Sequence, residues 1–131
     1  HLASINYPEG LEPNTPDMIM HGEVRLAKKR FAFNDSGQKH DFNFSEGVSL
    51  LVKCDDQKEI DKYWEKLSAV PEAEECGWLK DKFGVSWQIV PKVMDDMFEE
   101  GTPEQLRRVT EAFLKMKKFD IDKLEKAFQE K

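Results

Sequence analysis

Alternating apolar and polar residues predict a β-strand near the start of the chain. Over residues 18–26 every second residue is apolar or Gly, the period of a strand with one buried face. A second run, residues 30–34, follows a short polar break, so the two runs together predict a hairpin. Residues 1–17 contain three prolines, and their spacing predicts a loop.

A longer apolar and β-branched run, residues 47–54, predicts a central strand of a sheet. A helix is expected to follow over residues 57–68, because Asp56 is a good N-cap and Glu59 lies at the capping-box spacing. The remaining elements expected in this region are an acidic loop at 71–75 and two strands, at 77–80 and 85–90.

Two amphipathic helices are predicted at the end of the chain. Thr102 and Gln105 have the spacing of a capping box, and Asp120 can cap a second helix. The first helix carries an apolar stripe, including Phe113, that is too apolar to face water alone. We therefore expect both helices to pack on the domain or on a second copy of it. If Phe113 is buried, its truncation to Ala should cost about 3–5 kcal/mol.

Length and charge limit the class of protein. A chain of 131 residues is long enough for one core and short for two ordinary domains. The formal net charge of −6 argues against nucleic acid as a partner, because binding its backbone needs a basic surface. No apolar run is long enough to cross a membrane, so we expect no membrane partner and a cytoplasmic location. Cys54 and Cys76 are expected to be reduced.

Residues 76–91 (CGWLKDKFGVSWQIVP) strongly resemble the signature of the PhnB-like, or 3-demethylubiquinone-9 3-methyltransferase, family of the glyoxalase (vicinal oxygen chelate) superfamily. Residues 47–54 leading into 64–67, and residues 116–121, support this resemblance. Residues 18–128 are covered approximately. The resemblance implies an α+β fold in which βαβββ modules form a cupped mixed sheet, followed by two C-terminal helices.

The expected organisation follows from this resemblance. A glyoxalase-like domain spans residues 1–95, with a partial first module at 1–46 and a second module at 47–95, and a helical extension spans 96–131. The strand and helix that normally open the first module are expected to be missing from this chain. The methyltransferase label finds no support in the residues, because the order of elements offers no doubly wound domain with a glycine-rich strand-to-helix turn.

The motif for the metal site of the superfamily is not met. By resemblance, the ligand positions of the second module fall at Val48, which cannot bind a metal, and at Gln88, a weak neutral donor. The first module offers only Asn34. A catalytic divalent ion usually needs three or four ligands of the imidazole, thiolate or carboxylate type. We therefore expect no metal and no cofactor.

Candidate binding residues lie on the predicted strands. His21 and Glu23 share a strand face and could act as a base with its orienting group or as metal ligands, although Glu23 could simply pair with Arg25. Trp78 and Trp87 are expected to face inward on neighbouring strands, as a lining for a flat ligand or as ordinary core, with Gln88 pointing to the opposite side from Trp87. The residues expected to border a ligand site in the cup are His21, Asn34, Trp78, Trp87 and Gln88. Cys76 has acidic neighbours that raise a thiol pKa, so it is a poor nucleophile candidate.

The function expected from these observations is binding of a small organic molecule, with the reaction unassigned, by a protein that forms a homodimer. Two alternatives remain open. One is a metal-dependent lyase or dioxygenase of the same superfamily that uses His21, Glu23 or Gln88 in another arrangement. The other is a non-catalytic structural or partner-binding module whose surface is the C-terminal helix pair.

Overall fold

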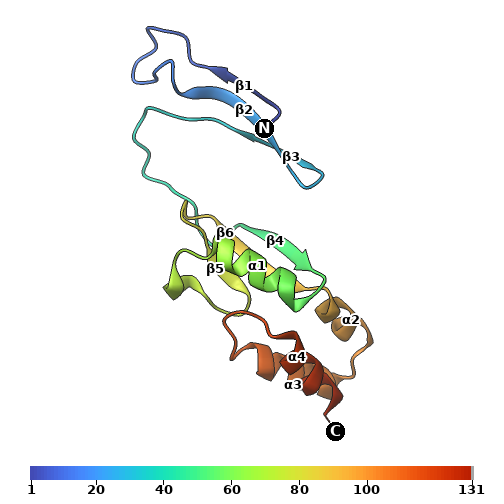
Figure 1. Cartoon of the computed structure of the whole chain (residues 1–131). Coiled ribbons are helices and arrows are strands. Elements are labelled where there is room, and N and C mark those ends of the chain that lie inside the picture. The colour runs from blue at the N-terminus through green and yellow to red at the C-terminus, as the bar shows by residue number, and fades with distance from the viewer. Residues whose placement is uncertain (131) are drawn as a thin grey trace. The chain divides into compact units, whose positions relative to one another are not determined.

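The computed structural model describes residues 1–130, which divide into two compact units, His1–Phe42 and a second unit that begins at Asn43 (Figure 1). Each unit has its own three-stranded sheet. The α+β class expected from the sequence is confirmed. None of the helices in the described part of the chain is long and apolar enough to cross a bilayer.

The first unit is an antiparallel sheet in the order β1-β2-β3. Its strands are β1 (Ala3–Asn6), β2 (Ile19–Leu26) and β3 (Lys29–Phe33). The predicted hairpin of β2 and β3 is confirmed, with Gly22 directly opposite Phe33. The prediction that residues 1–17 form only a loop is wrong, because β1 pairs with β2. The strand ends before the first proline, so the prolines that argued against regular structure do not interrupt its hydrogen bonds.

The second unit contains a mixed sheet, four α-helices and one turn of 3-10 helix within its described residues. Its elements, in chain order, are β4 (Ser49–Cys54), α1 (Gln57–Leu67), η1 (Pro71–Ala73), β5 (Trp78–Lys80), β6 (Ser86–Pro91), α2 (Val93–Glu100), α3 (Pro103–Phe113) and α4 (Ile121–Gln129). The expected N-cap of α1 is confirmed, since the Asp56 carboxylate accepts a hydrogen bond from the Glu59 amide.

The strand order of this sheet is β4-β6-β5, so β6 is central and β4 lies at an edge. The prediction of a central β4 is therefore wrong. The connection through α1 returns the chain as an antiparallel β5–β6 pair, and β6 then lies parallel to β4. The apolar composition of the β4 region was therefore a misleading sign of a central strand. Two of its apolar residues are largely exposed, Val48 at 78% and Leu51 at 51%.

The hydrophobic core lies in the second unit, between one face of its sheet and the helices. Residues Val52, Cys54, Leu79 and Ile89 from the sheet contribute to it, together with Ile60 of α1. The register of the strands places Val52 beside Ile89, so both belong to this core face. The residues that alternate with them form the other face of the sheet.

The C-terminal helices belong to the same core. Val109 of α3, Leu124 of α4 and Met94 and Met97 of α2 are buried in it, and α3 and α4 lie side by side (Figure 1). The predicted capping box of Thr102 and Gln105 is present. Helix α2 was not predicted, because its N-cap position, Lys92, offers no capping side chain.

The aromatic residue buried by the helices is Phe119, whereas Phe113 is half-buried and packs edge-on against it, with ring centroids 6.2 Å apart. The loss of about 3–5 kcal/mol expected for Phe113→Ala depended on burial of this side chain, and that condition is not fully met. Phe119 lies in the loop between α3 and α4, and the side chain of Gln57 bridges this loop to α1 through the carbonyl of Phe119 and the amide of Ile121.

A tight turn just before β5 makes backbone contact with the loop between these helices. Cys76 and Gly77 both have positive φ, 48° and 82°, the signature of a two-residue type I′ turn between Glu75 and Trp78. The turn is closed by two backbone hydrogen bonds between Glu75 and Trp78. Its own two amides donate to the carbonyls of Met116 and Lys117, at 2.9 and 2.7 Å. The α3–α4 loop therefore holds the start of β5 in place.

We predict that Gly77→Ala destabilises the protein by about 2–5 kcal/mol, the sum of left-handed backbone strain and overpacking. A Cβ at this position would lie 2.4 Å from the Phe119 ring. Gly84→Ala is the matched control, because Gly84 has a φ of 87° but no atom within 4 Å of the added Cβ. Chemical denaturation should therefore give a smaller loss for it, about 1–2 kcal/mol. Equal losses would show that contact with Phe119 is unimportant.

Candidate functional site

His21 and Asn34, the candidates from the first unit, have exposed side chains. His21 is 54% exposed at its side chain, and its Nε2 lies 3.8 Å from the Glu23 carboxylate. Glu23 forms its ion pair with Arg30 of the neighbouring strand, not with Arg25, and this contact lowers the pKa of Glu23. The Asn34 amide donates to the adjacent Asp35 carbonyl at 3.3 Å. These contacts describe a solvated, paired strand surface.

The prediction that Trp78 and Trp87 face the same side is wrong. Trp78 lies opposite Gln88 across the β5–β6 pair, whereas Trp87 lies opposite Leu79. Because directly opposite residues share a face, the two indoles project from opposite faces of the sheet. Trp87 packs against the core and donates its Nε1–H to Asp81 at 2.9 Å. Only Trp78 is on the face away from the core.

Gln88 points to the opposite side from Trp87, as predicted. Its amide Nε2 donates to the Ser49 hydroxyl at 2.8 Å, so one of its polar groups is satisfied by the neighbouring strand. Gln88, Trp78 and Leu51 lie in one row across the three strands, and Lys80, Ser86 and Ser49 lie in the next. We call the surface made by these six residues the pocket face.

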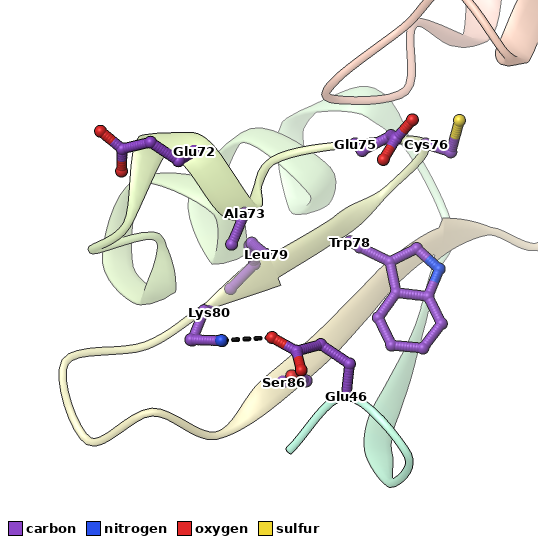
Figure 2. Close-up of a pocket in the computed structure, with 9 residues that line it drawn as sticks. All are labelled: Glu46, Glu72, Ala73, Glu75, Cys76, Trp78, Leu79, Lys80 and Ser86. Atoms are coloured by element: carbon purple, nitrogen blue, oxygen red, sulfur yellow. Dashed lines mark hydrogen bonds and ion pairs between the residues drawn. The ribbon is translucent and has the colours of Figure 1, made fainter. Parts of the chain in front are cut away.

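A pocket with a volume of about 390 Å³ opens on this face at the β5 edge (Figure 2). It is lined by Trp78, Lys80 and Ser86 of the pocket face and by residues of η1 and the type I′ turn. Figure 2 shows Glu75 and Cys76 together at the end near Trp78, and Glu72 at the other end. The lining combines apolar side chains with charged and polar ones, and the volume is in the range of small-molecule sites.

Ser86 is the most unusual residue of the pocket. It is 2% exposed, and its hydroxyl is the one buried side-chain polar atom without a hydrogen-bond partner among residues 1–130. A buried hydroxyl without a partner costs about 1–3 kcal/mol, so such groups are rare in native proteins. Ser86 lines the pocket, so a bound molecule could supply the missing partner.

An ion pair lies beside Ser86. Lys80, which is directly opposite Ser86 across the strands, pairs with Glu46 (Figure 2). The hydrogen bond from Lys80 holds the pKa of the Glu46 carboxyl below its ordinary value. The Glu46 carboxylate is therefore ionised at neutral pH, and within the ion pair its charge is balanced by that of Lys80.

The thiol of Cys76 is at the rim but is not activated. Burial, with a smaller contribution from Glu75, raises its pKa, as the acidic neighbours in the sequence led us to expect. Its Sγ approaches the carbonyl of Phe113 at 3.6 Å. Burial, and then Glu59, raises the pKa of Cys54 to about 11. The two cysteines are not bonded to each other.

We predict that neither thiol reacts readily in the folded protein. Because the thiolate is the nucleophile and both pKa values are raised, alkylation by iodoacetamide at pH 8 should be slower than in urea-unfolded protein. Cys76 should be modified before Cys54, which is 0% exposed. Peptide mapping by mass spectrometry would measure both rates. Modification of Cys54 first would contradict the burial of its strand end.

Metal ligands do not gather in the described chain: no group of three or more His, Cys, Asp or Glu side chains within residues 1–130 is arranged to hold an ion. The absence of a metal and of a cofactor stays a prediction. Elemental analysis of protein purified without chelators should find less than stoichiometric zinc, nickel, iron or manganese. A stoichiometric metal that is lost on mutation of His21 or Glu23 would favour the metal-dependent alternative.

Sequence reasoning missed Ser86, Lys80, Glu46 and Glu75. Two signals were available. Ser86 is two residues before Gln88 in a strand, so alternation places both on one face. The Cys76-Gly77 pair, with Gly second, is a hairpin signal that places Glu75 beside Trp78. Glu46, in contrast, reaches the pocket from a loop, and no spacing rule predicts that approach.

Comparisons with known proteins agree with this α+β, glyoxalase-like architecture. A structure described as a putative 3-demethylubiquinone-9 3-methyltransferase, PhnB protein, from Bacillus cereus is similar to the chain, with 31% sequence identity and a TM-score of 0.57. The similarity covers 69% of this chain and 77% of that one. A search of curated proteins finds no match.

The family model described as 3-demethylubiquinone-9 3-methyltransferase matches residues 1–90. The chain therefore belongs to this PhnB-like family, as the signature at 76–91 led us to expect. The match includes Trp78, Ser86 and all of β5 and β6 except Pro91.

Proposed function

We propose that this protein binds a small organic molecule on the pocket face of its second sheet, with Ser86 as the buried hydrogen-bonding group. The observation that carries the proposal is the unpartnered hydroxyl of Ser86 within the lining of a pocket. A polar group kept buried without a protein partner lowers stability, and functional sites are where such a cost persists.

The other polar groups of the face support a site of this kind. Gln88 is anchored by Ser49, which fixes the direction of its amide, and Trp78 supplies a flat apolar wall. Of the five residues expected from the sequence, Trp78 and Gln88 are proposed for this site. Trp87 faces the core, and His21 and Asn34 belong to the other unit.

We predict opposite effects of Ser86→Ala on stability and on binding. Removing the unpartnered hydroxyl should leave the free energy of unfolding unchanged or raise it by about 1 kcal/mol. It should also weaken binding of a neutral probe, 2-phenylethanol, by about threefold to tenfold, because one buried hydrogen bond is lost. Denaturation and NMR titration followed at the Trp78 indole would measure the two effects.

Ser68→Ala is the matched stability control. The Ser68 hydroxyl donates to Glu74 at 2.6 Å, so the same substitution there removes a formed hydrogen bond and should lower stability by about 1 kcal/mol. The proposal is wrong if 2-phenylethanol gives no saturable change at Trp78, or if Ser86→Ala lowers stability as Ser68→Ala does and leaves binding intact.

Homodimer formation and the cytoplasmic location expected from the sequence remain part of the proposal. Val48, just before β4, and Leu51 of β4 are both exposed, which is consistent with a contact between two copies at this edge of the sheet.

A further inference from the structure

The charges that line the pocket do not cancel. Glu46 is neutralised by Lys80, but Glu72 and Glu75 form no ion pair among residues 1–130. Two carboxylates therefore remain at the rim without a basic partner. A cation that enters the pocket meets a favourable field, whereas an anion meets an unfavourable one.

The type I′ turn places one of these carboxylates beside an aromatic ring. Glu75 and Trp78 are the residues that flank the turn, and their reciprocal backbone hydrogen bonds, 2.7 and 3.2 Å, make them a directly opposed pair. Directly opposed side chains project from the same face. A carboxylate next to an indole is a combination that attracts an organic cation, through charge on one side and the ring face on the other.

Ser86 is the independent sign that a molecule belongs there. Its buried hydroxyl has no hydrogen-bond partner in the described part of the chain, and Trp78 and Ser86 both line the pocket. A carboxylate cluster alone would also suit a metal ion, but the described residues offer no group of three or more ligands arranged to hold one. The remaining cationic class is an organic amine, whose ammonium and carbon skeleton use the carboxylate, the ring and the hydroxyl together.

We propose that the pocket selects small organic amines, with the ammonium group at Glu75 and Trp78 and a polar group or the edge of the skeleton at Ser86. This inference rests on the proposed binding function and specifies its ligand class. Glu72, at the far end of the pocket, adds to the negative field without touching the same atoms (Figure 2).

Three probes with the same phenyl skeleton test the selection: 2-phenylethylamine, 2-phenylethanol and phenylacetate, which are cationic, neutral and anionic at pH 7. NMR titration of the full chain, followed at the Trp78 indole N–H, should give an affinity for the amine about tenfold above that for the alcohol, with phenylacetate weakest.

Glu75→Gln should lower the affinity for the amine about fivefold and leave that for the alcohol unchanged. Glu65→Gln is the matched control, because Glu65 is an exposed residue of α1 outside the pocket and the change in net charge is the same. The affinity of Glu65→Gln for the amine should equal that of the unchanged protein.

The outcomes separate this inference from the proposed function. Equal affinities for amine and alcohol, both weakened by Ser86→Ala, would retain the binding site and overturn the preference for amines. Equal losses in Glu75→Gln and Glu65→Gln would also overturn it, as a general charge effect. If no probe alters the Trp78 signal, both the site and its ligand class are wrong.

Discussion

The second unit depends on the contact between the Gly77 turn and the loop between α3 and α4. The Phe119 ring occupies the space that a side chain at Gly77 would need, and the two amides of the turn donate to the carbonyls of Met116 and Lys117. This contact joins the C-terminal helices to the sheet, because side chains of both belong to the one hydrophobic core that includes Phe119. It also fixes the position of Glu75 and Trp78, which flank the turn. Stability and the candidate site therefore share one structural constraint.

The two faces of the β4-β6-β5 sheet have different roles in the unit. One face carries Ile89, Leu79 and Val52 and is sealed by the helices, so it supplies most of the hydrophobic stabilisation. The other carries Ser86, Gln88 and Trp78, whose polar atoms would be costly in a closed core. Since stability is provided by the first face, the second can retain a buried hydroxyl without a partner. This separation is what makes Ser86 informative about function rather than about folding.

The charged side chains of the lining make the pocket more favourable for cations than for anions. Lys80 and Glu46 neutralise each other, and the hydrogen bond from Lys80 lowers the pKa of Glu46, which keeps its carboxylate ionised at neutral pH. Glu72 and Glu75, which form no ion pair within the described residues 1–130, lie at the two ends of the lining, near η1 and near the type I′ turn. A non-catalytic protein–protein surface made by the helix pair is less well supported, because the apolar stripes of α3 and α4 are largely used within their own unit.

The sequence by itself determined the family, the α+β class and most of the elements, because these depend on local signals. Alternation located β2 and β3, capping residues located α1, α3 and α4, and the signature at 76–91 identified the relatives. Strand order was decided only by the tertiary structure, since the apolar run of β4 suits an edge or a centre equally until α1 returns the chain. For the candidate site, too, some features followed from local sequence signals and others only from the tertiary structure. The alternation of side chains along β6 correctly placed Gln88 and Trp87 on opposite faces of the sheet. The face of Trp78, in contrast, depended on the register between β5 and β6, which the Gly77 turn sets. Glu46 reaches Lys80 through long-range packing that no local spacing encodes.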